Sequence, residues 1–155
     1  MDSKFDVWLD GILPRHSRLT EMVTALMQSL ISNKGIDHLA VTGRTKKKSK
    51  AIEKIARKGY KNPPRQLTDL TGVRIIVYFE SQVEQVSELI KEAFNVDLKN
   101  SLNKDEALSV NQTGYRSVHY VCDLGPARLA LPEFSGLAEL KFEFQVRTLL
   151  QHAWA

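Results

Sequence analysis

Residues 73–79 read VRIIVYF, a nearly continuous run of β-branched and aromatic side chains. These residue types favour extended structure, and a run without regular polar alternation is typical of a strand inside a sheet. The sequence therefore predicts a central strand here, around which the other segments can be arranged.

Two further segments alternate between apolar and polar residues, as strands with one buried face do. Residues 138–148, AELKFEFQVRT, separate Phe142, Phe144 and Val146 from Lys141, Glu143, Gln145 and Arg147. Residues 111–124, NQTGYRSVHYVCDL, separate Val118, Tyr120 and Cys122 from Tyr115, Ser117 and His119. Both segments are predicted to be strands that carry a polar face.

Three helices are predicted between the strands. Residues 18–35 repeat apolar side chains at helical spacing and end at a glycine. Residues 48–59 form a basic helix that also ends at a glycine. Residues 81–94 form an amphipathic helix that opens with Ser81 as its cap.

The other segments are short or irregular. Residues 36–43 are predicted as a short strand, and residues 62–72 as a loop, because paired prolines do not fit a regular ladder. Residues 97–113 read as a polar loop and residues 128–137 as a poorly patterned connector. Interleaved helices and strands without a repeat predict an α/β fold of the α+β type, a mixed β-sheet flanked by helices.

Composition fits one domain over residues 1–155, with a helical N-terminal region over about residues 1–35. The net charge of +4 permits a polyanionic ligand without requiring one. Cys122 is the single cysteine, so an internal disulfide framework and a thiolate zinc site are excluded, and a reducing cytoplasmic setting fits. No leader-like N-terminus or apolar run long enough to cross a membrane is present in the sequence.

A basic run, GRTKKKSK at residues 43–50, combines Arg44 and four lysines with the hydroxyl of Ser49. Phosphate oxygens bind such donors, and arginine can bind them through two hydrogen bonds. A solvated helix start has the same composition, so the run alone does not decide between the two interpretations. The spacing of a P-loop is absent.

Two carboxylates are candidate metal ligands. Asp69 directly precedes the predicted central strand, where turn and cap residues are also common, and Glu143 lies on the polar face of an alternating strand. If the two strands are neighbours, this pair could bind Mg²⁺, which prefers carboxylate and phosphate oxygens and retains some waters. The polar face of Tyr115, Ser117 and His119 either surrounds a stacked base or is simply half-exposed.

Four motifs in this order resemble the synthetase domain of the RelA/SpoT family, which makes the alarmones (p)ppGpp. They are GRTK with a following serine, DLTGVR, GYRSVHY and EFQVRTLLQHAWA, and the resemblance runs from about Val41 to the last residue. The last two motifs are the most specific. The resemblance implies a nucleotidyltransferase-like mixed sheet and an ATP:GTP 3′-diphosphotransferase, a GTP pyrophosphokinase that moves the β,γ-pyrophosphate of ATP to GDP or GTP.

The resemblance also implies roles for individual residues. Asp69 and Glu143 would be catalytic and would hold Mg²⁺, with Glu143 as metal ligand or as acceptor of the 3′-hydroxyl proton. ATP would be bound by Arg44, Lys46, Ser49, Lys54 and Arg74. The acceptor would be bound by Tyr115, Ser117, His119, Gln145 and Arg147, with Tyr115 stacked on the guanine. A homo-oligomer is compatible with the resemblance, and no membrane is involved.

Three departures bear on function. Asn111, Gln112 and Thr113 replace the lysine and asparagine that often precede the GY pair, so the acceptor remains open among GDP, GTP, ATP and the 3′ end of tRNA. The histidine–aspartate motif of the family's hydrolase domain is absent from the sequence. The chain stops at QHAWA, where the family continues into further helix, so a fragment is expected. The alternatives to alarmone synthesis are a toxin-like tRNA pyrophosphokinase and an inactive nucleotide-binding module.

Overall fold

The computed structural model describes residues 3–103 and 117–154. Within these residues, five strands form one sheet in the order β1-β2-β5-β4-β3. The strands are β1 (Ala40–Thr45), β2 (Thr71–Val77), β3 (Asn95–Asn103), β4 (Ser117–Asp123) and β5 (Phe142–Thr148). β2 and β5 run parallel, whereas the other neighbouring pairs are antiparallel, so the predicted mixed sheet is confirmed.

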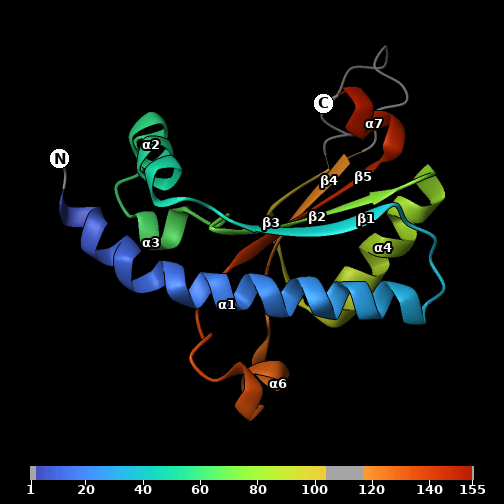
Figure 1. Ribbon diagram of the computed structural model, residues 1–155, viewed down its shortest axis with the longest axis horizontal. Helices are drawn as coiled ribbons and strands as arrows, with labels where there is room; N and C mark the ends of the chain where they lie inside the picture. The colour runs from blue at the N-terminus through green and yellow to red at the C-terminus, as the bar shows by residue number, and fades with distance from the viewer. Residues whose placement is uncertain (1–2, 104–116, 155) are drawn as a thin grey trace.

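Two helices cover one face of this sheet. α1 (Ser3–Asn33) runs along the sheet beneath β1 and β2, and α4 (Glu80–Ala93) packs beside it (Figure 1). Side chains from β2, β4 and β5 meet both helices in one apolar core. The helix-covered face therefore supplies the main hydrophobic stabilisation of the domain.

The predicted alternation of β5 is confirmed. Phe142, Phe144 and Val146 are fully buried in the core, and Phe94 joins the two phenylalanines with ring centroids 5.3–5.5 Å apart. Glu143 and Gln145 lie on the opposite face and are half-buried. One strand thus carries the centre of the core on one side and polar groups on the other.

α1 begins 15 residues earlier than the periodicity of residues 18–35 predicted. Its N-terminal half buries Leu9 in a second cluster with Ala51, Ile55 and Leu70, and this burial extends the helix beyond the strongest repeat. Pro14 lies inside α1, where its ring nitrogen cannot donate a helical hydrogen bond. Tertiary packing therefore outweighs the local cost of the proline.

α2 (Lys48–Lys58) confirms the basic helix and ends at Gly59, which has a left-handed φ of 66°. The predicted loop at 62–72 contains one helical turn, α3 (Pro63–Gln66), because proline suits the first turn of a helix even though it does not fit a strand. The predicted serine cap is wrong. α4 starts at Glu80, and the Gln82 side chain accepts hydrogen bonds from the backbone of Tyr78 and Phe79.

The polar loop expected at residues 97–113 is wrong over its first part, because β3 continues to Asn103 and pairs with β4 through an irregular register. β1 starts at Ala40 rather than at residue 36. The connector before β5 contains α6 (Pro126–Leu129) and the short 3₁₀ helix η1 (Pro132–Phe134), and α7 (Leu149–Trp154) follows β5. None of the helices in the described part of the chain combines the length and the apolar composition of a membrane span.

Candidate active site

The open face of the sheet aligns polar residues from separate strands. In one row, Arg44 of β1 pairs with Gly72 of β2, and Gly72 pairs with Glu143 of β5. A Cβ atom placed on Gly72 would meet nothing within 4 Å, so this glycine leaves open space between the two charged residues. A cavity of about 310 Å³ lies over this part of the sheet.

A second row crosses the same face, one pleat further along the strands. Arg74, Gln145 and His119 are register partners on β2, β5 and β4. The Arg74 Nε atom donates to Gln145 Oε1 at 3.0 Å, and Gln145 Nε2 lies 3.0 Å from His119 Nε2. Because an amide nitrogen only donates, His119 accepts at Nε2, and its neutral ring carries the hydrogen on Nδ1. All three residues line the cavity.

Asp69 lies where the chain enters β2, and two lysines contact it. Its Oδ2 atom is 2.8 Å from Lys54 Nζ and 3.2 Å from Lys46 Nζ. Burial alone would raise the pKa of Asp69, but the hydrogen bonds and charges of Lys54 and Lys46 outweigh it and hold the pKa below its usual value. Asp69 is therefore an ionised carboxylate that lines the cavity.

Glu143 lines the same cavity, which brings the two predicted carboxylates to one site. The Thr68 hydroxyl donates to Glu143 Oε2 at 2.6 Å and so holds this side chain beside the loop that carries Asp69. Thr68 was missed from the sequence, because a threonine before an aspartate in a loop has no distinguishing pattern. The register of β2 and β5, which the sequence could not supply, explains the proximity of Glu143 to Gly72.

The donor set fits Mg²⁺. Asp69 Oδ1 is buried and has no hydrogen-bond partner in the described structure, so it offers a negatively charged oxygen that a cation would satisfy. No cluster of three or more His, Cys, Asp or Glu among the described residues could enclose a metal. Two carboxylates completed by water and substrate phosphates form the kind of site that Mg²⁺ commonly occupies.

Beside the cavity, α2 and β1 form a basic groove of about 440 Å³. Arg44 lines both spaces, which connects the groove to the cavity. Lys46 and Lys54 also line the groove, as do further cations of α2: Lys50 and Arg57. Ser49 is exposed on the first turn of α2 and lines neither space.

Ser117 and Arg147 are predicted acceptor residues that the structure places away from the cavity lining. They are register partners in a third row and both are buried. Arg147 donates from Nη2 to His152 Nδ1 at 2.9 Å, whereas its Nε atom is buried without a partner in the described structure. His152 of α7 was missed because the residues after β5 show no clear periodicity.

The core-facing side of β4 agrees with the predicted alternation, because Val118, Tyr120 and Cys122 are buried in the main core. Burial, followed by the charge of Asp123, raises the pKa of the Cys122 thiol far above its ordinary value, so Cys122 is an unreactive core residue. Tyr115, the predicted stacking residue, lies outside the described residues.

A family model described as "Region found in RelA / SpoT proteins" matches residues 43–155. Small alarmone synthetase 1 from Bacillus subtilis is 25% identical with a TM-score of 0.74, and the match covers 96% of this chain and 75% of that one. The structure of the same synthetase bound to its product pppGpp is 24% identical with a TM-score of 0.74, and that match covers 96% of this chain and 76% of the other.

Small alarmone synthetase 2 from Bacillus subtilis is 20% identical, with a TM-score of 0.73, and the match covers 94% of this chain and 74% of that chain. A likeness at this level of identity shows the shared fold. No curated protein sequence matches the chain. The family match covers the basic run, both carboxylates and all five strands except the first residues of β1.

Proposed function

Because this chain belongs to the RelA/SpoT family, we propose that it is an alarmone synthetase that transfers the β,γ-pyrophosphate of ATP to the 3′-hydroxyl of GDP or GTP. The observation that carries the proposal is the cavity on the open face, where Asp69, Glu143 and Arg44 meet and Lys46 and Lys54 contact Asp69. Pyrophosphate transfer needs positioned cations and carboxylates more than it needs a covalent nucleophile.

The donor would lie along β1 and α2. Arg44 and Arg74 line the cavity from adjacent strands, and both side chains are exposed and accessible to a nucleotide. Lys46 and Lys54 would exchange part of their contact with Asp69 for phosphate oxygens. Ser49 would contact the phosphates only at the outer end of the bound ATP, since it lines neither space.

Asp69 and Glu143 would hold Mg²⁺, which when bound neutralises charge on the phosphates. In the transfer, the acceptor 3′-oxygen forms a bond to the β-phosphorus of ATP, and the bond between that phosphorus and the α,β-bridging oxygen breaks, releasing AMP. As an alternative to holding the metal, Glu143 would accept the proton of the 3′-hydroxyl through Oε1, since Thr68 occupies its Oε2 atom.

The acceptor would lie over β4 and β5. His119 and Gln145 line the cavity, and their contact fixes the His119 tautomer with its hydrogen on Nδ1. Tyr115 is four residues before His119 in the sequence, a spacing that puts both on one face of a strand, and Tyr115 would stack on the guanine. Ser117 and Arg147 would support the acceptor from the adjacent row, where the unsatisfied Arg147 Nε could bind an anion.

One observation favours a second candidate. The exposed Lys47, Lys50 and Arg57 extend the basic groove beyond the groups that contact Asp69, and such a surface can bind an RNA backbone. Transfer to the 3′ end of tRNA would use the same donor site and a larger acceptor.

The chain should be incubated with ATP labelled on the γ-phosphate and, in parallel, GDP, GTP, ATP or deacylated tRNA. Because the γ-phosphate travels with the transferred group, the label identifies the acceptor. We expect labelled GDP or GTP product. Label on tRNA alone would support the second candidate, and no labelled acceptor would support the inactive nucleotide-binding module.

A further inference from the structure

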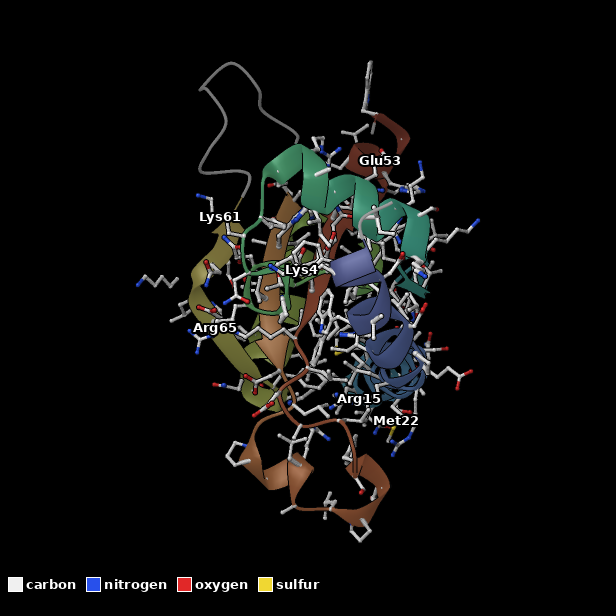
Figure 2. All side chains as sticks on the ribbon, turned by 90° about the vertical axis from the view of Figure 1, so that its left-hand side faces the viewer. Lys4, Arg15, Met22, Glu53, Lys61 and Arg65 are labelled. Carbon is white, nitrogen blue, oxygen red and sulfur yellow. The ribbon has the colours of Figure 1, made fainter. Side chains whose placement is uncertain are left out.

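A second cavity, of about 730 Å³, shares no lining residue with the candidate active site. α1, α3 and the segment before β5 enclose it. Figure 2 views this end of the molecule, with Arg15 of α1 and Arg65 of α3 labelled. A cavity of this size can take a small organic ligand.

Apolar side chains form much of its wall. Trp8 and Ile12 contribute from α1, while Leu67 and Leu70 contribute from the loop before β2. Leu67 and Leu70 are buried, whereas Trp8 is only half-buried. An indole at the wall of an otherwise aliphatic cavity favours a flat ring, because offset or edge-to-face packing of aromatic rings adds to the burial of apolar area.

His16 brings a polar atom into this apolar wall. It is 4% exposed, and its Nδ1 lies 2.8 Å from Thr71 Oγ1. Thr20 donates to the His16 carbonyl, and the single hydroxyl hydrogen of Thr71 can go to that carbonyl or to Thr20; in either case Thr71 accepts from His16, which puts the ring hydrogen on Nδ1. The Nε2 atom then carries a lone pair and has no partner among the described residues.

Burial, followed by the charge of Arg15, lowers the pKa of His16 to about 4, so this acceptor persists at neutral pH. A ligand with an N–H or O–H group on its ring would satisfy it. A ligand without such a group would displace water from this acceptor without replacing its hydrogen bond, and would therefore bind less tightly.

The rim of the cavity is cationic. Arg15, Arg65 and Lys141 line it together with one carboxylate, that of Glu139. Arg15 donates hydrogen bonds to the backbone oxygens of Gly136 and Ala138 at 2.8 and 3.1 Å. Lys141 forms a salt bridge with Asp97 at 3.4 Å. Arg65 is exposed, and its guanidinium has no partner in the described structure. An anionic group on the ligand would provide that partner.

The backbone at the rim is strained. Glu139 has a φ of 68°, and it is the one non-glycine residue with positive φ in the described part of the chain. Residues with strained backbone conformations are common at binding and catalytic sites. Arg15 holds the flanking carbonyl groups, so α1 maintains the strained segment that closes this side of the cavity.

We propose that this cavity binds a small aromatic anion whose ring carries a hydrogen-bond donor. The ring lies against Trp8, its N–H or O–H group donates to His16 Nε2, and its anionic group pairs with Arg65. The site is independent of the proposed transfer reaction, since no residue of the cavity at Asp69 and Glu143 takes part.

Indole-3-acetate is a suitable probe, because it combines a flat ring, a ring N–H and a carboxylate. Two related compounds isolate its features: tryptophol lacks the charge, and 1-methylindole-3-acetate lacks the ring N–H. Binding to the full chain would be followed by the NMR signals of its two indole N–H groups, which belong to Trp8 and Trp154. The Trp154→Phe variant assigns them.

We expect indole-3-acetate to shift the Trp8 signal and not that of Trp154, with tryptophol and the methylated compound each binding about 5- to 10-fold more weakly. Arg65→Gln should weaken the binding of indole-3-acetate by a similar factor and leave the affinity for tryptophol unchanged. The matched control is Lys34→Gln, an exposed cation near the other end of α1. An unmoved Trp8 signal at millimolar probe, or equal affinity for all three compounds, would overturn the proposal.

Discussion

The two faces of the sheet differ in what their side chains contact. On the helix-covered face, Phe142 and Phe144 are fully buried against other apolar groups. On the open face of the same strand, Glu143 and Gln145 are half-buried and hydrogen-bonded to polar residues of neighbouring segments. Alternation along one strand thus places residues that stabilise the fold next to residues that line the site, so adjacent substitutions should affect different properties.

Phe142→Ala should have the largest effect on stability. Truncating a buried phenylalanine removes apolar contacts and leaves a cavity, which typically costs about 3–5 kcal/mol of unfolding free energy. Chemical denaturation of the variant measures this loss. A cost below about 1 kcal/mol would mean that the helix-covered face does not dominate the stability of the domain.

Asp69→Asn should lower pyrophosphate transfer by at least about 100-fold while the domain remains folded, because removal of one preorganised charged group has effects of this size. Asp97→Asn is the matched control, since Asp97 also pairs with a lysine but lines neither the cavity nor the basic groove. The measurement is the rate of label transfer from γ-labelled ATP. Equal rates in the two variants would remove Asp69 from the reaction.

His16 should make the helix-covered side sensitive to acid. Its pKa is about 4 in the folded chain and 6.5 in the unfolded chain, so below pH 6.5 the unfolded state binds the proton more readily. This contribution to stability is complete above pH 6.5 and is lost as the pH falls towards 4. Between pH 7 and pH 5 the loss should be about 2 kcal/mol.

Denaturation of His16→Gln at both pH values tests this assignment. The variant lacks the titrating group, so its stability should fall less between pH 7 and pH 5 than that of the unchanged chain, whatever its stability at pH 7. An identical fall in both proteins would show that other groups cause the acid sensitivity.

Tyr115→Ala should weaken acceptor binding by about 1–3 kcal/mol, the usual contribution of a base–aromatic stack, and leave ATP binding close to normal. Tyr115→Phe keeps the ring face, so it should bind the acceptor almost normally. Titration of both variants with the acceptor, alongside thermal melting, separates stacking from packing. A steep fall in melting temperature with unchanged acceptor affinity would assign Tyr115 to the core.

Much of this arrangement could be predicted from the sequence, because alternation with a period of two is a local property. The faces of β4 and β5 follow from this alternation, and the basic helix α2 follows from helical spacing, which is equally local. The pairing of Asp69 with two lysines could not be predicted, since it depends on how α2 packs beside the loop before β2. Non-local packing also explains why the strand β3 was missed and why helical periodicity marked only residues 18–35 for α1.

The residues that line the two cavities also depend on non-local packing that sequence patterns do not predict. Glu143 was predicted as a partner of Asp69, but its contact with Thr68 depends on the parallel register of β2 and β5. His16 has no motif in the sequence, and only the meeting of α1 with Thr71 makes it a buried acceptor. Residues gain such roles from neighbours that are distant along the chain, so no spacing rule identifies them.

The most direct test compares Glu143→Gln with Phe144→Leu, adjacent substitutions on opposite faces of β5. Transfer from γ-labelled ATP and unfolding free energy would be measured for both. We predict that Glu143→Gln loses at least about 100-fold in transfer with little change in stability. Phe144→Leu should lose about 1–3 kcal/mol of stability while its folded fraction retains transfer. Near-normal transfer by folded Glu143→Gln would contradict the assignment of the open face to catalysis.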